Sequence, residues 1–230
     1  MFMGFDIEVE PLPDAELLAI RGVFDPAKVK YGRLKDPAKK REKLEEEEAK
    51  WNDLDTLLLD ARFCRICAIG VVGKKIGSEK VRTVLDPDTD EKALITDIWS
   101  AINTAVNRSG VVVGFNHKGY DLPMLRRRSW ILGIKPPKYI IEKSKFWNAH
   151  IVDLLEEWRS GQTWSDAACG GLDGLARAFG LPPKLGTGDM FYKQLRSGDP
   201  VQIQQAIDYN LDEMRKIHFI ADRMGLIDGI

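Results

Sequence analysis

The pattern of hydrophobic and polar positions along the chain predicts strands first, then a strand framed by helices, and then mostly helices. Short apolar or alternating runs predict strands at residues 2–9, 65–73, 80–86 and 110–116, and the last of these is apolar throughout, as in a buried central strand. Apolar positions recur at helical spacing in the remaining segments, which we expect to be helices: 88–108, 121–133, 150–159, 172–180 and 200–224. This order favours a mixed α/β layout built on one sheet.

One charged stretch, residues 25–60, departs from this pattern. Lysine, arginine and glutamate alternate there at helical spacing with few apolar residues, which favours a solvated helix with ion pairs between neighbouring turns. A mobile basic arm that contacts a substrate is the alternative. Residues 15–24, just before it, are expected to form a short helix or a loop. We therefore expect residues 1–230 to form a single domain with a charged insertion at about 25–60.

The composition narrows the class of protein. Hydrophobic residues make up 44% of the chain and charged residues 30%, as in soluble globular proteins. The formal net charge is -1, so any nucleic-acid partner must be held by a local basic patch. Of the three cysteines, Cys64 and Cys67 are expected to be buried thiols in a reducing compartment. No apolar run is long enough for a membrane span, and the chain begins directly with a strand, so we expect a cytoplasmic protein without a membrane partner.

Three segments of the chain carry acidic residues that are candidates for a functional site. Asp6 and Glu8 lie two apart on a predicted strand, where their carboxylates share one face and repel each other. In "GFNHKGYD" the buried-looking strand is followed by Asp121, and "AIDYNLDEMRKI" places Tyr209 among further acids on the last helix. A cluster of carboxylates from distant segments needs cations, and oxygen ligands favour magnesium or manganese over zinc. Two such ions can promote phosphodiester cleavage.

The same segments resemble a known group of enzymes. "DIE", "GFNHKGYDLPMLRRR" and "YNLDEM" look like the three exonuclease motifs of the DnaQ-like (DEDD) 3'–5' exonuclease superfamily. The likeness is to its tyrosine branch, as in the proofreading domains of family-B polymerases and their stand-alone relatives. "ICAIGVV", "HIVDLLE" and "LDGLARAFGLPPK" resemble the elements between these motifs. The resemblance implies an RNase H-like fold, which is a mixed central β-sheet flanked by helices.

The resemblance also implies a role for each matching residue. Asp6 would bridge two Mg²⁺ or Mn²⁺ ions, Glu8 would hold the ion that carries the attacking water, and Asp121 would serve the second ion. Tyr209 would orient or help to deprotonate that water. The expected substrate-binding residues are Ile7, Phe115 and Asn116.

The third motif departs from the family pattern of a tyrosine, three residues and an aspartate. The fourth residue after Tyr209 is Glu213, whereas Asp212 is the third. Because residues four apart share one helical face, and the apolar positions of the helix fit the same register, we assign Glu213 as the fourth acid. Asp212 is the alternative fourth acid, and Asp208 with Asp212 forms a further possible pair.

Other residues have structural as well as functional interpretations. Three successive helical residues point in different directions, so at most one of the arginines at 126–128 is expected near a phosphate. Lys184 and Lys193 are candidates for contacts with a nucleic-acid backbone. We expect Trp147, Trp158 and Trp164 to pack within the protein, and His150 and His218 to have structural roles.

The leading hypothesis is a metal-dependent enzyme that removes 3'-terminal nucleotides from single-stranded nucleic acid, with DNA favoured over RNA. It releases nucleoside 5'-monophosphates, and we expect a stand-alone nuclease or a separate subunit with a replication or recombination partner. An RNA-trimming enzyme of the same fold is the nearest alternative. A catalytically weakened module that binds nucleic acid is the alternative from another class.

Overall fold

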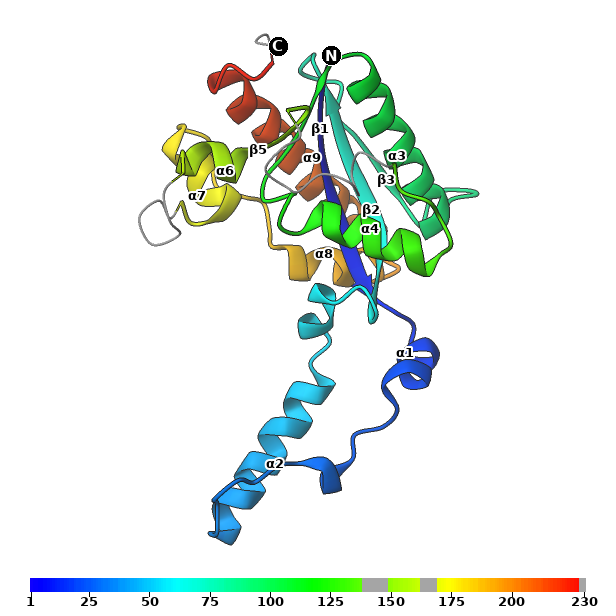
Figure 1. Cartoon of the computed structure of the whole chain (residues 1–230), viewed down its shortest axis with the longest axis vertical. Helices are drawn as coiled ribbons and strands as arrows, with labels where there is room; N and C mark the ends of the chain where they lie inside the picture. Colours follow the sequence, from blue (N-terminus) through cyan, green and yellow to red (C-terminus); the bar gives the residue numbers. More distant parts are fainter. Residues whose placement is uncertain (138–148, 162–168, 228–230) are drawn as a thin grey trace. The chain divides into compact units, whose positions relative to one another are not determined.

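A computed structural model describes residues 1–137, 149–161 and 169–227 of the chain (Figure 1). The chain divides into two compact units, one formed by Met1–Val9 with Ile66–Ile230 and the other by Glu10–Arg65. We call them the sheet unit and the 10–65 unit. The charged insertion expected at about 25–60 falls inside the 10–65 unit, and the single-domain organisation stays a prediction.

The secondary structure of the described residues is a series of strands and helices. The strands are β1 Phe2–Pro11, β2 Cys64–Gly73, β3 Lys80–Thr83, β4 Val111–Gly114 and β5 Ile151–Asp153. The helices of the sheet unit are α3 Glu91–Asn107, α4 Asp121–Ile131, α6 Leu154–Arg159, α7 Gly171–Ala178, α8 Gly188–Leu195 and α9 Pro200–Arg223. The helices of the 10–65 unit are α1 Asp14–Arg21, α2 Pro37–Asn52 and two short 3₁₀ turns, Pro26–Lys28 and Asp55–Leu59.

The central sheet has the strand order β3-β2-β1-β4-β5. β1 and β4 run parallel, with Gly4 opposite Val113, and β4 and β5 are also parallel. β2 and β3 are antiparallel, with Ala68 opposite Thr83. The sheet is therefore mixed and is flanked by helices, as in the RNase H-like fold. The expected fold class is confirmed.

Helices cover both faces of β1, which explains why almost every one of its residues is buried. In Figure 1, α4 crosses in front of the strands and α9 lies behind them. Glycines let α9 approach closely: a side chain at Gly4 would meet Ile217, and one at Gly70 would overlap Asn210. The even positions of β1, which include Asp6 and Glu8, therefore face α9.

One core cluster, which we call the α9 core, lies between the sheet and the helices α7 and α9. It is built from aliphatic side chains of the strands and from the apolar stripe of α9, whose spacing matches the helical period. Its members are Phe2, Val72, Val111, Val113, Leu154, Leu172, Leu175, Ala176, Met214, Ile217, Ile220 and Ala221. This packing holds α9 in one register against β1.

Two expected elements differ in the structure. The strand expected at 80–86 ends at Thr83, because the Thr83 N–H donates to the Asp86 carboxylate and the chain turns there. The helix expected at 150–159 is wrong in its first part, since Ile151–Asp153 pair with β4 as β5. Asp153 has an extended backbone and accepts from the Leu155 N–H, so the helix α6 begins only at Leu154.

The 10–65 unit has a small core and a large solvated surface. Leu12, Leu17 and Leu57 pack together, and the Leu12 N–H donates to the Phe63 carbonyl. α2 contains no buried residue, which confirms the expected solvated helix. Residues 15–24 contain most of α1, so the expected short helix is also confirmed.

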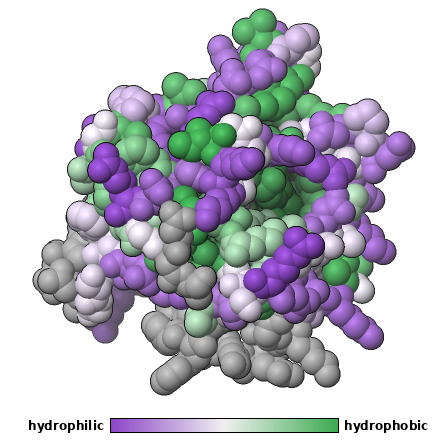
Figure 2. All heavy atoms as spheres, turned by 90° about the horizontal axis from the view of Figure 1, so that it is seen from above, coloured by the Kyte–Doolittle hydropathy of each residue, from purple (hydrophilic) through white to green (hydrophobic). Residues whose placement is uncertain are grey.

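Other expectations can be compared with the surface. Cys64 and Cys67 are buried thiols, as expected. None of the helices in the described ranges is both long enough and apolar enough to cross a bilayer. The face in Figure 2 is mostly hydrophilic, with apolar side chains in separate patches. Trp147 and Trp164 lie outside the described residues.

Candidate active site

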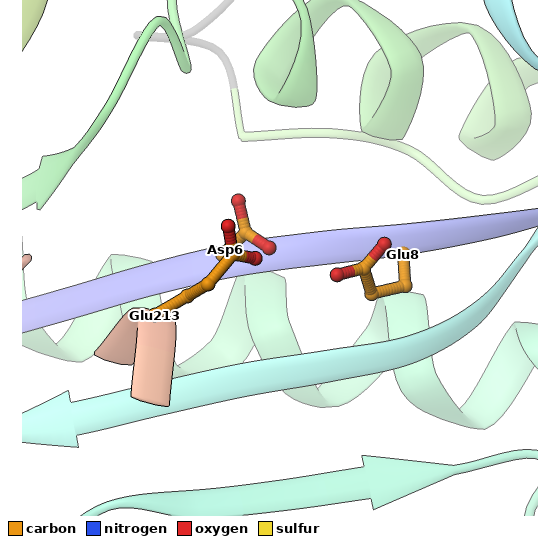
Figure 3. Close-up of side chains that lie close together, drawn as sticks. All are labelled: Asp6, Glu8 and Glu213. Atoms are coloured by element: carbon orange, nitrogen blue, oxygen red, sulfur yellow. The ribbon is translucent and has the colours of Figure 1, made fainter. Parts of the chain in front are cut away.

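Three carboxylates from β1 and α9 converge (Figure 3). Asp6, Glu8 and Glu213 each offer a carboxylate oxygen, and these oxygens all lie within 4.8 Å of one another. Glu8 and Glu213 are buried, and Asp6 is half-buried. Asp6 and Glu8 share the face of β1 that receives α9, so the packing of α9 on the sheet brings Glu213 to them.

Asp121 joins this region from the other side of β1. It is buried at the first position of α4, and its carboxylate accepts a hydrogen bond of 3.1 Å from the Ile7 backbone N–H. Ile7 lies between Asp6 and Glu8 in the chain, so the hydrogen bond ties α4 to this part of β1. The Ile7 side chain itself is buried, and its role in substrate binding stays a prediction.

The carboxylates are held in a state that resists ionisation. Burial, followed by the charges of Glu213, Asp121 and Glu8, raises the pKa of Asp6 well above its ordinary value. Burial and the charge of Glu213 likewise raise the pKa of Glu8, against the Asn210 hydrogen bond. The pKa of Asp121 rises to about 7 because of burial, although the Ile7 N–H opposes the shift. Such mutual repulsion is relieved by a bound cation.

Lys184 carries the ammonium group that bonds to the three-carboxylate cluster, and no other lysine of the described residues does so. Lys184 Nζ donates to Glu213 Oε1 and lies 3.5 Å from the Tyr209 hydroxyl. Although burial disfavours its charged form, Glu213, Asp6 and Glu8 raise the pKa of Lys184. Burial and the charge of Glu213 raise the pKa of Tyr209. At neutral pH Tyr209 is therefore a hydrogen-bonding hydroxyl rather than a phenolate.

Asn210 is a site residue that the sequence did not single out. It is fully buried, and its Nδ2 lies 3.4 Å from both Asp6 Oδ2 and Glu8 Oε1. Its Oδ1 is buried and has no hydrogen-bond partner in the described part of the chain. The available signal was an amide next to Tyr209 on the inward face of the last helix. Its effect is to position the two carboxylates of β1.

The two acids considered for the third motif have different partners. Asp212 pairs with Lys216, whose ammonium also donates to the Pro183 carbonyl at 3.2 Å. Glu213 instead lies with Asp6 and Glu8. Asp208 is exposed and accepts from Gln204 Nε2 at 2.9 Å. The geometry thus brings Glu213 to the cluster, whereas Asp212 is held in an ion pair with a lysine one turn along.

The other expected substrate contacts lie at the end of β4. Phe115 is half-buried against the α9 core. Asn116 is exposed with a φ of 56°, and its N–H donates to Asp153 Oδ1 at 2.8 Å. The Asp153 carboxylate also accepts from the Lys118 N–H at 3.0 Å, so it holds this turn in shape. Substrate binding by Phe115 and Asn116 stays a prediction.

The remaining candidates divide into structural and surface residues. Of the three arginines on α4, Arg128 is buried and pairs with Glu91, Arg126 lies over Trp130 and Arg127 is exposed. The other candidates make local contacts, which are the Gly110 carbonyl for His150, the Lys74 carbonyl for His218, Phe179 for Trp158 and the Tyr192 ring for Lys193. His150, His218 and Trp158 thus have the structural contacts expected of them.

Comparison with known proteins agrees with this geometry. Residues 57–217, more than half of the chain, match the family described as "Predicted 3'-5' exonuclease related to the exonuclease domain of PolB". The match includes Asp121, Tyr209 and Glu213, whereas Asp6 and Glu8 precede it. The comparison with curated proteins found no match.

A solved structure supports the fold. The chain is similar to the family B DNA polymerase from the hyperthermophilic archaeon Pyrobaculum calidifontis, with a TM-score of 0.53 and 18% sequence identity. The similarity covers 97% of this chain and 24% of the polymerase, so the chain spans about a quarter of that protein's length. At this identity the likeness establishes the fold alone.

The family match explains why buried carboxylates gather at this point of the fold, because exonuclease domains of this kind use divalent metals and the cluster offers oxygen ligands for them. The expected kinship with polymerase exonuclease domains is confirmed, and the protein is a nuclease. The chain belongs to the family of predicted 3'–5' exonucleases related to the exonuclease domain of PolB.

Proposed function

We propose that the protein removes nucleotides from the 3' end of single-stranded DNA and releases nucleoside 5'-monophosphates, in a reaction that requires Mg²⁺ or Mn²⁺. The observation that carries this proposal is the convergence of Asp6, Glu8 and Glu213 within 4.8 Å. DNA is favoured over RNA by the relation of the family to a DNA polymerase domain.

The residues of the cluster fit two divalent ions. Asp6, Glu8 and Glu213 would hold one ion, and Asp121 with Asp6 would hold the other. The Asn210 amide nitrogen, 3.4 Å from Asp6 Oδ2 and from Glu8 Oε1, would hold these two carboxylates in place. When bound, the ions would neutralise the carboxylates, lower the pKa of a water molecule and stabilise charge on the phosphodiester.

The side chains around the cluster would complete the reaction. The Tyr209 hydroxyl, with its raised pKa, would act as a hydrogen-bond donor or acceptor that orients the attacking water. Lys184 contacts both Tyr209 and Glu213, so it would hold their positions and offer positive charge to a phosphate. Phe115 and Asn116 would contact the terminal nucleotides.

The test is a cleavage assay on a 5'-labelled single strand of DNA, with magnesium, with manganese and with chelator. We expect a ladder that shortens from the 3' end with either metal and no cleavage with chelator. Glu213→Gln should remove the activity, because it removes a charged ligand without changing the shape of the side chain. Asp222→Asn, at an exposed position of the same helix, is the matched control.

Two outcomes would change the proposal. If Asp212→Asn removed the activity and Glu213→Gln did not, the fourth acid would be Asp212. If the wild-type protein bound the strand but cleaved neither DNA nor a matched RNA with either metal, the weakened binding module would replace the enzyme. Faster cleavage of the RNA would make the protein an RNA-trimming enzyme, distinguished by contacts to the 2'-hydroxyl.

A further inference from the structure

The 10–65 unit contains a basic segment that the candidate active site does not use. Residues 21–43 hold nine lysine and arginine residues against three acidic ones. The basic residues are Arg21, Lys28, Lys30, Arg33, Lys35, Lys39, Lys40, Arg41 and Lys43. The whole chain has a net charge of -1, so this local excess is a feature of one region.

Part of this segment lines a cavity of about 430 Å³ that the 10–65 unit forms by itself. The cations at the cavity are Arg21, Lys28, Lys30 and Lys43, and the rings are Phe24 and Trp51. Two acids also line it, but each has a lysine partner: Asp25 lies 3.7 Å from Lys28 and Glu47 lies 3.5 Å from Lys50. Net positive charge therefore remains at the cavity.

The cations of the cavity have different roles. Arg21 donates to the Trp51 carbonyl at 2.6 Å, and its guanidinium lies 4.3 Å from the Trp51 ring centroid. Phe24 and Trp51 lie with ring centroids 6.0 Å apart. Arg21 and Phe24 therefore hold the tryptophan in place. No ion pair is recorded for Lys30 or Lys43 among the described residues, so their charges face the solvent or a ligand.

The order of charges along α2 is unfavourable for the helix itself. Its first half carries Lys39, Lys40, Arg41 and Lys43 with one acid, Glu42, and its second half carries Glu45–Glu48 with one base, Lys50. A helix dipole favours the opposite arrangement, with acids near the N-terminus and bases near the C-terminus. The first turn contains no acid. Helix stability therefore does not explain this grouping of cations, of which Lys43 lines the cavity.

We propose that this cavity and the basic first half of α2 bind the phosphate backbone of a single-stranded nucleic acid, with Phe24 and Trp51 offering apolar surface to its bases. The inference rests on the proposed function, in that the strand is the substrate of the nuclease. It assigns the 10–65 unit a substrate contact of its own, in addition to the contacts of the candidate active site.

The test measures binding without cleavage. Fluorescence anisotropy of a labelled strand of about 20 nucleotides, longer than a typical site for one groove, is recorded with the full chain in chelator. The variant is Lys28→Gln/Lys30→Gln/Lys43→Gln. The control is Lys74→Gln/Lys75→Gln/Lys80→Gln, which removes the same charge from exposed positions of the sheet unit. Circular dichroism melting verifies that both variants are folded.

Loss of three phosphate contacts should weaken binding by about tenfold and reduce the slope of log K against log salt by about 2. The control variant should lose affinity too, but the change in its log K should be less than half of that in the triple variant. Equal losses of affinity in the two variants would show that only the net charge matters, and would overturn the proposal. Unchanged binding by the triple variant would also overturn it. Competition by polyglutamate as strong as that by the oligonucleotide would identify a general polyanion site and also overturn it.

The outcome can be separated from that of the proposed function. If the wild-type protein binds the strand without cleaving it with either metal, and the triple variant binds about tenfold more weakly than the wild type while the control does not, the proposed reaction fails while the binding site stands. If the wild-type protein cleaves DNA and the triple variant binds as the wild type does, the binding site fails while the proposed reaction stands.

Discussion

The two compact units hold charge in opposite ways. In the sheet unit, Asp6, Glu8 and Glu213 converge with little solvent around them. In the 10–65 unit, α2 is charged along its length and has no buried residue. Buried like charges cost free energy unless a ligand compensates them, whereas solvated charges cost little. Burial therefore identifies the carboxylate cluster as a site, whereas the basic segment is informative only through its grouping around a cavity.

The largest effect is expected when one buried carboxylate is neutralised. Asp6→Asn should reduce the rate of strand cleavage by at least about 10³-fold, since it removes a metal ligand worth several kcal/mol in the transition state. The metal-free variant should at the same time be about 1 kcal/mol more stable, because repulsion within the cluster is relieved. Single-turnover kinetics and urea unfolding in chelator measure the two quantities. A less stable variant would show that the cluster is not strained.

The next effect concerns pH. Because the folded pKa of Asp121 is raised to about 7 from 3.8, the folded state retains a proton that the unfolded state loses. Stability of the metal-free protein should therefore fall as pH rises from about 4 to about 7, by up to about 4 kcal/mol from this group. Urea unfolding at several pH values in chelator measures the slope.

A variant isolates the contribution of Asp121. His117 is fully buried and its pKa is lowered to about 3 by burial and by Lys118, against Glu156. Its stabilising effect is lost as pH falls from about 6.5, which opposes the slope from Asp121. The difference between wild type and Asp121→Asn removes this background. A difference that does not change with pH would contradict the raised pKa.

Lys184 should matter most when metal is absent. Lys184→Met leaves the Glu213 carboxylate buried without its cation, and we expect a loss of about 3 kcal/mol in chelator. Manganese should reduce this loss, because the ion supplies the missing positive charge. Denaturant unfolding with and without manganese measures both values. Lys193→Met, at an exposed position of α8, should change stability by less than about 0.5 kcal/mol.

The close approach of α9 to β2 should be sensitive to a single methyl group. Gly70→Ala places a Cβ atom where the Asn210 amide lies, and we expect a cost of about 2 kcal/mol together with slower cleavage. Gly73→Ala is the control, since its methyl group meets only the Ser78 side chain. Thermal unfolding and the cleavage rate measure the effects. Equal behaviour of the two variants would show that α9 can shift without consequence.

The smallest effects are expected in the 10–65 unit. Lys39→Glu puts an acid in the first turn of α2 and should stabilise that helix by about 0.5 kcal/mol. Lys50→Glu puts an acid in the last turn and should destabilise the helix by a similar amount. Hydrogen exchange of the α2 amides measures both changes. Effects as large as those in the sheet unit would mean that the charges of α2 are not solvated.

The sequence by itself determined the elements with a clear period. The apolar run of β4 and the long period of α9 each report a local pattern of burial, so their positions agreed closely with the structure. Short elements were harder. Ile151–Asp153 were expected to be helical, because three residues carry no period of their own and strand pairing with β4 decided their conformation.

The candidate site divides in the same way. The pairing of Asp6 and Glu8 could be predicted, because residues two apart on a strand lie on the same face. Spacing along α9 favoured Glu213 over Asp212. In the structure Glu213 lies with Asp6 and Glu8, and Asp212 pairs with Lys216. Asn210 and the lysine bond to Glu213 depend on contacts between segments far apart in the chain. Such contacts arise when the helix and the sheet bury their apolar faces together, and local sequence carries no record of them.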